Sequence, residues 1–325
     1  MPQSFGISRS RVARSSFLAM TAGGIATLSP AMLRAQASPD VIHVATVPID
    51  AGAEAYYAAD AGFFRDAGLN VLVQPLTTGA AIGAALISGS LEIGFSNLLS
   101  LAAAREHGLA LQLLFPGSLY LSRSPATVLL VAPDSTIHEA RDLNGLTIGV
   151  PGLGNVTGLG ALAWADQHGG DAKSLKFVEF PPAELPAAVE QHRVSAAIVT
   201  EPFVTASAGK LRVLAPGMSS IGSEFVIGGW IVSKAWADAH RATALKLADV
   251  FAKTARWANS HHSESGVILS KYTNLAPDLA SRMVRTAYAE RVDLPSIQVE
   301  LDAAVKYGFL KNSVQAADLL WAPPL

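Results

Sequence analysis

The sequence contains no cysteine among its 325 residues. This absence excludes a disulfide framework, and it also removes the cysteine to which a lipoprotein anchor would be attached. The folded state must therefore depend on a hydrophobic core. A chain of this length is long enough for one or two domains with good cores.

Charged residues are scarce, at 15% of the chain, whereas hydrophobic residues make up 50%. This balance favours a buried α/β protein over a disordered one. Residues 1–37 hold four basic residues and no acidic one, which leaves 20 basic and 26 acidic residues, a net charge of −6, in the remainder. Mild acidity argues against nucleic acid or an anionic membrane surface as a partner.

Signatures of catalysis and of metal binding are missing as well. The sequence has no G-x-S-x-G and no H-E-x-x-H motif, and the adjacent pair His261-His262 would point in different directions on a helix. We therefore expect no catalytic residue, no metal site and no cofactor. Beyond the N-terminal leader, no run is long and apolar enough to span a membrane.

Residues 1–37 have the pattern of a cleaved signal peptide. Three arginines (Arg9, Arg11 and Arg14) precede a short apolar stretch, 17–28, and Ala35-Gln36-Ala37 supplies a small-x-small cleavage site. Arg14-Ser15 stands where a twin-arginine signal has two arginines. Export by the Sec route or by a degenerate twin-arginine signal therefore both stay open. Without a lipid anchor, the expected location is the periplasm of a double-membrane cell.

In the remainder, short β-rich runs alternate with helical runs, which predicts sheets with parallel strands covered by helices on both faces. The expected strands are 42–45, 70–74, 92–95, 111–115, 127–131, 147–150, 176–180, 196–199, 212–214 and 226–232. The expected helices are 55–67, 80–88, 98–106, 157–167, 183–191, 202–206, 234–263, 265–272, 276–290 and 296–308.

This order of elements predicts two α/β lobes between which the chain crosses twice. After the leader, residues 38–123 with 233–325 form the first lobe, and residues 124–232 form an inserted second lobe. In parallel α/β sheets, ligands bind beyond the carboxyl ends of the strands, next to helix N-termini. The residues expected to bind a ligand there are Asp50, Tyr56, Thr77, Thr78, Gly79, Ser96, Asn97, Gly154, Asn155, Thr157, Glu201 and Trp230.

Each candidate also has a structural interpretation. Asp50 suits the first turn of a helix, and threonine or asparagine at these positions are normal N-caps. Glycines such as Gly154 suit a tight turn, Tyr56 and Trp230 suit core packing, and Glu201 suits a structural role beside a hinge. These loops have almost no lysine or arginine, so an anion would be held by backbone N–H groups and hydroxyls. Nearby acids leave room for an amine-bearing or heterocyclic ligand instead.

Five segments carry a resemblance to a known family: 56–71, with its Tyr-Tyr and Gly-Phe-Phe elements, 85–94, 134–137, 142–150 and Glu201-Pro202. Together they resemble the solute-binding proteins of ABC importers in the nitrate/taurine/aliphatic-sulfonate group, also called SsuA/THI5-like or NMT1-like. Members bind sulfonates, taurine, nitrate, bicarbonate, pyrimidines or aromatic acids. The resemblance implies a two-lobed type II periplasmic-binding fold with the ligand cleft between the lobes.

The resemblance also implies a function. The chain would be a monomer that captures a small molecule, with a sulfonate-like or carboxylate anion favoured, and delivers it to an inner-membrane permease with its ATPase. A thiamine-pyrimidine precursor or another heterocyclic nutrient is the alternative ligand, and a sensory binding protein is the alternative role. Enzymes on the same fold, the pyrimidine synthases of the THI5 kind and porphobilinogen deaminase-like enzymes, depend on cysteine, which this chain lacks.

Overall fold

The computed structural model describes residues 41–273 and 275–322. The leader prediction therefore lies outside the described residues. A first mixed sheet has the strand order β2-β1-β3-β12-β4. Its strands are β1 (Ile42–Thr46), β2 (Val71–Pro75), β3 (Ile93–Asn97), β4 (Leu111–Pro116) and β12 (Gly228–Ser233). β1 runs parallel to β2 and β3, whereas β12 runs antiparallel to β3 and β4.

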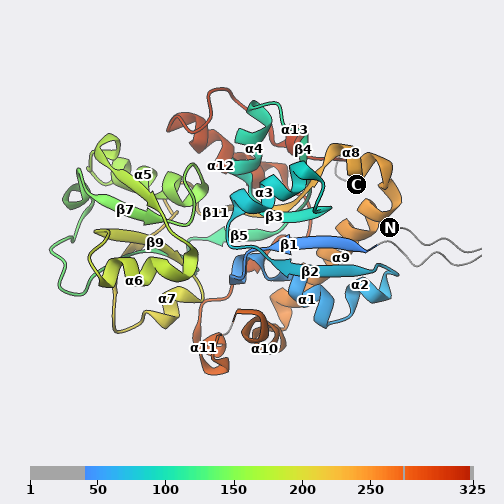
Figure 1. Ribbon diagram of the computed structural model, residues 1–325. Helices are drawn as coiled ribbons and strands as arrows, with labels where there is room; N and C mark the ends of the chain where they lie inside the picture. The colour runs from blue at the N-terminus through green and yellow to red at the C-terminus, as the bar shows by residue number, and fades with distance from the viewer. Residues whose placement is uncertain (1–40, 274, 323–325) are drawn as a thin grey trace, which may run out of the picture. The chain divides into compact units, whose positions relative to one another are not determined.

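Helices cover both faces of this sheet (Figure 1). Val44 faces the cluster built with α1 (Glu54–Asp60), α2 (Phe63–Asp66) and α9 (Arg241–Ser260), and Ala45 faces the one built with α3 (Gly79–Ser88), α4 (Leu98–Glu106) and α12 (Leu294–Lys306). Successive strand residues face opposite ways, so each strand serves both cores. The remaining C-terminal helices are α8 (Lys234–Ala239), α10 (His262–Thr273), α11 (Pro277–Arg282) and α13 (Ala316–Leu319).

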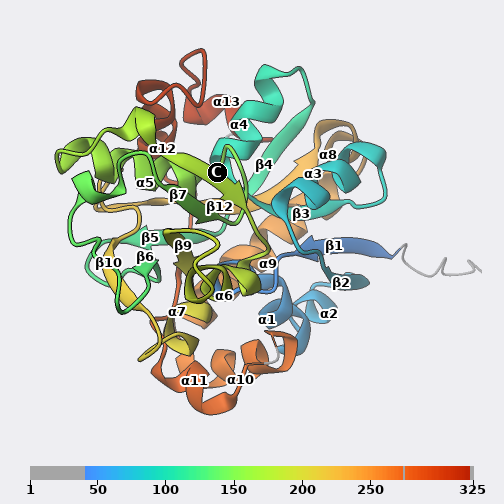
Figure 2. The same cartoon turned by 60° about the vertical axis from the view of Figure 1, so that its left-hand side comes forward.

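A second mixed sheet has the order β10-β6-β9-β7-β8. Its strands are β6 (Thr127–Val131), β7 (Thr147–Val150), β8 (Lys176–Glu179), β9 (Ala196–Thr200) and β10 (Arg212–Pro216). α5 (Val156–Gln167) covers one face and α6 (Leu185–Glu190) the other, while α7 (Phe203–Ala206) follows β9 (Figure 2). The α/β fold class predicted from the sequence is confirmed, with mixed sheets.

A third, small sheet joins β5 (Ser118–Leu121) to β11 (Glu224–Val226) and β13 (Ala287–Tyr288), both antiparallel. β5 precedes the second sheet in the chain and β11 follows it. The lobe boundaries at 123/124 and 232/233 stay a prediction, since the described residues belong to one compact unit. In the described part of the chain, every helix is too short or too polar to cross a bilayer.

Four of the predicted elements are wrong in detail. The expected helix 234–263 is two helices, α8 and α9, separated at His240, and α10 begins at His262. The expected helix 55–67 is divided into α1 and α2 at Gly62, whose φ of +80° lies in the left-handed region where glycine has no Cβ penalty. The expected strand 226–232 is two strands, β11 and β12. The expected helix 276–290 stops at Arg282, and its second half contributes β13 instead.

Candidate functional site

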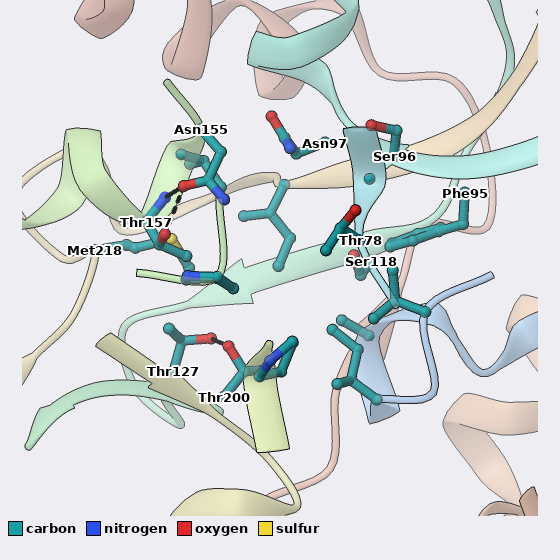
Figure 3. Close-up of a pocket in the computed structure, with 18 of the residues that line it drawn as sticks. Thr78, Phe95, Ser96, Asn97, Ser118, Thr127, Asn155, Thr157, Thr200 and Met218 are labelled. Atoms are coloured by element: carbon teal, nitrogen blue, oxygen red, sulfur yellow. Dashed lines mark hydrogen bonds between the residues drawn. The ribbon is translucent and has the colours of Figure 1, made fainter. Parts of the chain in front are cut away.

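A cavity of about 110 Å³ lies where strand ends of both sheets meet (Figure 3). The first sheet supplies the loop after β1, the β2–α3 loop and the end of β3, and the second supplies the ends of β6 and β9 and the β7–α5 turn. The lining residues are Val47, Ile49, Ala51, Thr77, Thr78, Gly79, Phe95, Ser96, Asn97, Ser118, Thr127, Pro151, Asn155, Val156, Thr157, Pro182, Thr200, Met218 and Ile227.

Three helices begin at this pocket, and each has a polar N-cap in its wall. Thr78 Oγ1 accepts the N–H of Ala81 at 3.2 Å at the start of α3. Asn97 Oδ1 accepts the N–H of Ser100 at 2.8 Å at the start of α4. Asn155 Oδ1 accepts the N–H groups of Thr157 and Gly158, at 3.1 and 3.4 Å, at the start of α5. Caps of this kind satisfy backbone donors that have no partner inside the helix.

Hydroxyl groups form much of the remaining polar wall. Thr127 and Thr200 share a hydrogen bond of 3.0 Å between their hydroxyl oxygens, and Figure 3 shows them facing each other across two strand ends. Ser118 is fully buried, and its Oγ has no hydrogen-bond partner within the described structure. A buried hydroxyl without a partner is costly, so Ser118 is the side chain in this wall that most needs a polar group from a ligand.

The apolar part of the wall includes Phe95, Met218 and Ile227. The ring of Phe95 packs edge-on against Trp230, with ring centroids 5.5 Å apart. Figure 3 shows Phe95 beside Ser96 and Ser118, and Met218 beside Thr157, so apolar and polar groups alternate around the pocket. A mainly apolar lining with a few polar groups is typical of pockets that bind small molecules.

A larger groove of about 530 Å³ shares part of this wall, including Thr78, Ser96 and Asn155. The groove continues between α3, α4 and the turn 151–154. Gly154 and the exposed Leu153 are among its lining residues. Of the predicted site residues, seven line the pocket (Thr77, Thr78, Gly79, Ser96, Asn97, Asn155 and Thr157), and Gly154 lines the groove.

The other four predicted residues do not line the pocket, and two of them are acids bonded within the protein. Asp50 is fully buried, and its carboxylate accepts from the Arg285 guanidinium at 3.1 Å and from the Thr286 N–H at 2.6 Å. Glu201 accepts from the Thr205 N–H at 2.9 Å and from the Val284 N–H at 3.3 Å. Burial raises the pKa of Glu201.

The two aromatic candidates are core residues. Tyr56 stacks on Tyr272 with ring centroids 4.2 Å apart, and burial together with this neighbour raises the pKa of Tyr56 to about 12. Trp230 is fully buried, and its Nε1–H donates to Glu54 Oε2 at 2.9 Å. Burial raises the pKa of Glu54 well above its ordinary value. Tyr56 and Trp230 therefore pack in the core, which is the structural role considered for them from the sequence.

The pocket lining also contains Ser118, Thr127 and Met218, which were not predicted as site residues. Ser118 begins β5, a strand that was not predicted, and Thr127 lies at the start of β6, not at a strand's carboxyl end. Met218 follows β10 without a helix after it. Among the residues that the structure describes, no cluster of histidine, aspartate or glutamate is arranged to hold a metal ion.

Comparison with known proteins places the chain in a family. The family model described as NMT1/THI5 like matches residues 52–265, and the chain belongs to this family. No curated protein sequence matches the chain significantly.

Solved structures share the fold at low sequence identity. The periplasmic aliphatic sulphonate-binding protein SsuA of Escherichia coli is 19% identical with a TM-score of 0.69, over 87% of this chain and 98% of its own. The periplasmic nitrate-binding protein NrtA of Synechocystis is 13% identical with a TM-score of 0.72, over 85% and 83%. The desulfurization enzyme DszB is 15% identical with a TM-score of 0.63, over 87% and 96%. The fold is that of the periplasmic binding proteins.

Proposed function

We propose that this chain is the periplasmic solute-binding component of an ABC importer and that it catalyses no reaction. The composition of the pocket wall supports this proposal, since it consists of hydroxyl, amide and apolar groups from both sheets. The described lining residues include no histidine, lysine, arginine, aspartate or glutamate, and the chain has no cysteine. Nucleophilic and acid–base catalysis usually need one of these groups within reach of the substrate.

The structural neighbours support the same proposal. SsuA and NrtA are named as periplasmic binding proteins, and SsuA binds aliphatic sulfonates whereas NrtA binds nitrate. DszB is named as an enzyme, so the fold alone does not separate binding from catalysis. The uncharged wall of this chain's pocket favours binding.

In the proposed mechanism, the ligand bridges two lobes, residues 38–123 with 233–325 and residues 124–232, which close on it by hinge rotation. Differential affinity of the ligand for the closed state drives closure. The closed monomer then docks on a permease whose ATPase supplies the energy. Two ligand classes fit this role: a small organic anion such as a sulfonate, taurine or a carboxylate, and a heterocyclic nutrient such as a thiamine-pyrimidine precursor. Residues 1–37 would direct export and be removed.

The test is thermal unfolding of the purified protein with a panel of taurine, alkanesulfonates, nitrate, aromatic carboxylates and thiamine-pyrimidine precursors. A true ligand at about 100 times its dissociation constant adds roughly 2.7 kcal/mol of stability, which gives a clear rise in Tm. Mass spectrometry of the recovered ligand should show it unchanged. Turnover of the ligand into a product would contradict the binding role.

A further inference from the structure

The described residues that line the pocket carry no charged side chain, and this restricts the charge of the ligand that the pocket can bind. We propose that the pocket selects an uncharged molecule, carrying an amide, hydroxyl or ring-nitrogen group on a small ring or short chain, over sulfonates and carboxylates of the same skeleton. The inference rests on the proposed function and narrows it. A buried ion requires a counter-charge or a full set of charge-assisted hydrogen bonds, and an uncharged polar group requires neither.

None of the described residues that directly precede or follow a lining residue in the sequence is a lysine or an arginine. Ala51 follows Asp50, and Thr200 precedes Glu201, so the ionisable groups adjoining the wall there are acids. The guanidinium of Arg285 is the cation next to Asp50, and it is already paired with that carboxylate. An anionic ligand would therefore enter a site with acids nearby and no free counter-ion among these groups.

The helix N-termini do not replace the missing cation. A helix N-terminus attracts anions because its first N–H groups lack partners and carry partial positive charge. Here the caps Thr78, Asn97 and Asn155 accept N–H groups of the first turns of α3, α4 and α5. At α4 a buried carboxyl group accepts another of these N–H groups, since Glu300 Oε1 accepts the Leu99 N–H at 2.9 Å. The donors that would hold an oxyanion are thus partly used inside the protein.

The groups that stay available suit an uncharged ligand. Ser118 Oγ is buried in the wall without a partner, and a hydroxyl both donates and accepts a hydrogen bond. An amide, alcohol or ring nitrogen matches it without bringing a charge. The apolar lining residues, which include Phe95, Met218 and Ile227, suit the carbon skeleton. The pocket volume of about 110 Å³ is somewhat below the roughly 150 Å³ of a cavity that holds benzene, so the pocket suits one small ring or a short chain.

The test compares ligands that share a skeleton and differ in charge. Isothermal titration calorimetry would use the protein purified after removal of its leader. The ligands would be benzamide, benzoate and benzenesulfonate, and then butyramide, butyrate and propanesulfonate. We expect an uncharged member to bind, with the anions of its series weaker by at least roughly tenfold. Equal or tighter binding of a sulfonate or carboxylate would overturn the inference and leave the proposed function in place. Absence of binding by every compound in this panel and by every solute of the first panel would overturn both.

Two variants sharpen the test. Ser118→Ala removes the unpartnered hydroxyl and should weaken binding of the uncharged ligand about fivefold to tenfold. Ser296→Ala is the matched control, since Ser296 Oγ is also buried without a partner but lies outside the pocket. The control should bind like the parent. Equal weakening in both variants would contradict a role for Ser118.

Thr77→Lys tests the charge argument directly. Thr77 is exposed at the rim of the pocket, so a lysine is accommodated there without core disruption. The added cation should strengthen binding of benzoate and benzenesulfonate relative to benzamide by several-fold, and high salt should reduce this gain. An unchanged ratio of the three affinities would count against charge as the basis of selection.

Discussion

Asp50 and Arg285 form an ion pair that the fold hides from solvent. Their side chains are 0% and 7% exposed, and Nη2 of the arginine lies 3.1 Å from Oδ1 of the aspartate. Tyr57 O–H donates to the same carboxylate oxygen at 3.0 Å. The pair thus joins the loop after β1 to the segment between α11 and β13, residues that are far apart in the chain.

Arg285→Met should destabilise the protein by about 3–5 kcal/mol, because it leaves a buried carboxylate without its counter-charge. Urea unfolding at pH 7 measures this loss. Arg282→Met is the control, since Arg282 pairs with Asp278 on the surface, with side chains 62% and 69% exposed. We expect the control to change stability by less than about 1 kcal/mol. Similar losses of unfolding free energy in both variants would show that the buried ion pair contributes no more to stability than the surface pair.

Glu300 gives a prediction for pH. Burial raises the pKa of Glu300 well above its ordinary value, so the folded protein keeps this proton at a pH where the unfolded chain has lost it. Folding stability therefore falls as pH rises from the unfolded pKa towards the folded one. Glu300→Gln keeps a neutral acceptor for the Leu99 N–H and cannot ionise.

Relative to the parent, Glu300→Gln should gain stability between pH 6 and pH 8, by at most about 1.4 kcal/mol per pH unit. Urea unfolding across this range measures the difference. Glu106→Gln is the comparison, because hydrogen bonds from the Asn312 and Lys311 N–H groups lower the pKa of Glu106. Both of its states are ionised above pH 6, so its difference from the parent should stay flat. A flat line for Glu300→Gln would mean that Glu300 is ionised in the fold.

At the scale of elements, α5 begins on a cap that is also part of the pocket wall. Asn155→Ala removes the acceptor for the Thr157 and Gly158 N–H groups and should cost about 1 kcal/mol of stability. Ser233→Ala removes the corresponding cap of α8, whose Oγ accepts the Trp236 N–H and lies outside the pocket. Urea unfolding should show comparable losses, while titration should show weakened ligand binding for Asn155→Ala alone. Weakened binding in both variants would trace the effect to general destabilisation.

The elements that could be predicted from sequence are those that local chemistry determines. The predicted helices 80–88 and 157–167 correspond to α3 and α5, because an N-cap precedes each and the preceding strand is strongly apolar. The segment after Arg282 could not be predicted in this way. There the Thr286 N–H donates to the Asp50 carboxylate and the Tyr288 N–H donates to Asn259 Oδ1, so tertiary partners replace the helical ones.

The residues of the candidate site also divide into those that the local sequence could predict and those that depend on tertiary contacts. Thr78, Asn97 and Asn155 lie in the pocket wall because the strand-to-helix geometry of α/β sheets brings such caps to one edge. The positions of Asp50, Tyr56, Glu201 and Trp230 depend on partners remote in the chain. Arg285, Tyr272, Val284 and Glu54 are these partners, and nothing in the local sequence pairs them. Ser118 escaped prediction because its short strand exists only through pairing with β11 and β13.

At the scale of the whole chain, the leader prediction can be tested by intact mass. Expressed in a double-membrane bacterium, the protein should be recovered from the periplasmic fraction with Ser38 as its first residue. Ala37→Lys should block cleavage, since signal peptidase requires a small residue there, and should leave the full-length precursor. Gln36→Lys changes the permissive middle position and should still be processed. A full-length product from the parent chain would contradict the leader assignment.

The pairing of β5 with β11 has a consequence for how such proteins diversify. Leu121 is paired with Glu224, and the Ser122 N–H donates to the Ser223 carbonyl at 2.8 Å, so the chain leaves and re-enters at one place. The segment 123–222 contains all five strands of the second sheet, and its two ends lie next to each other. Recombination at this point would transplant a complete sheet without rerouting the first. It would carry eight of the nineteen lining residues with it, among them Thr127, Asn155, Thr157, Thr200 and Met218, and so exchange that part of the pocket wall in one step.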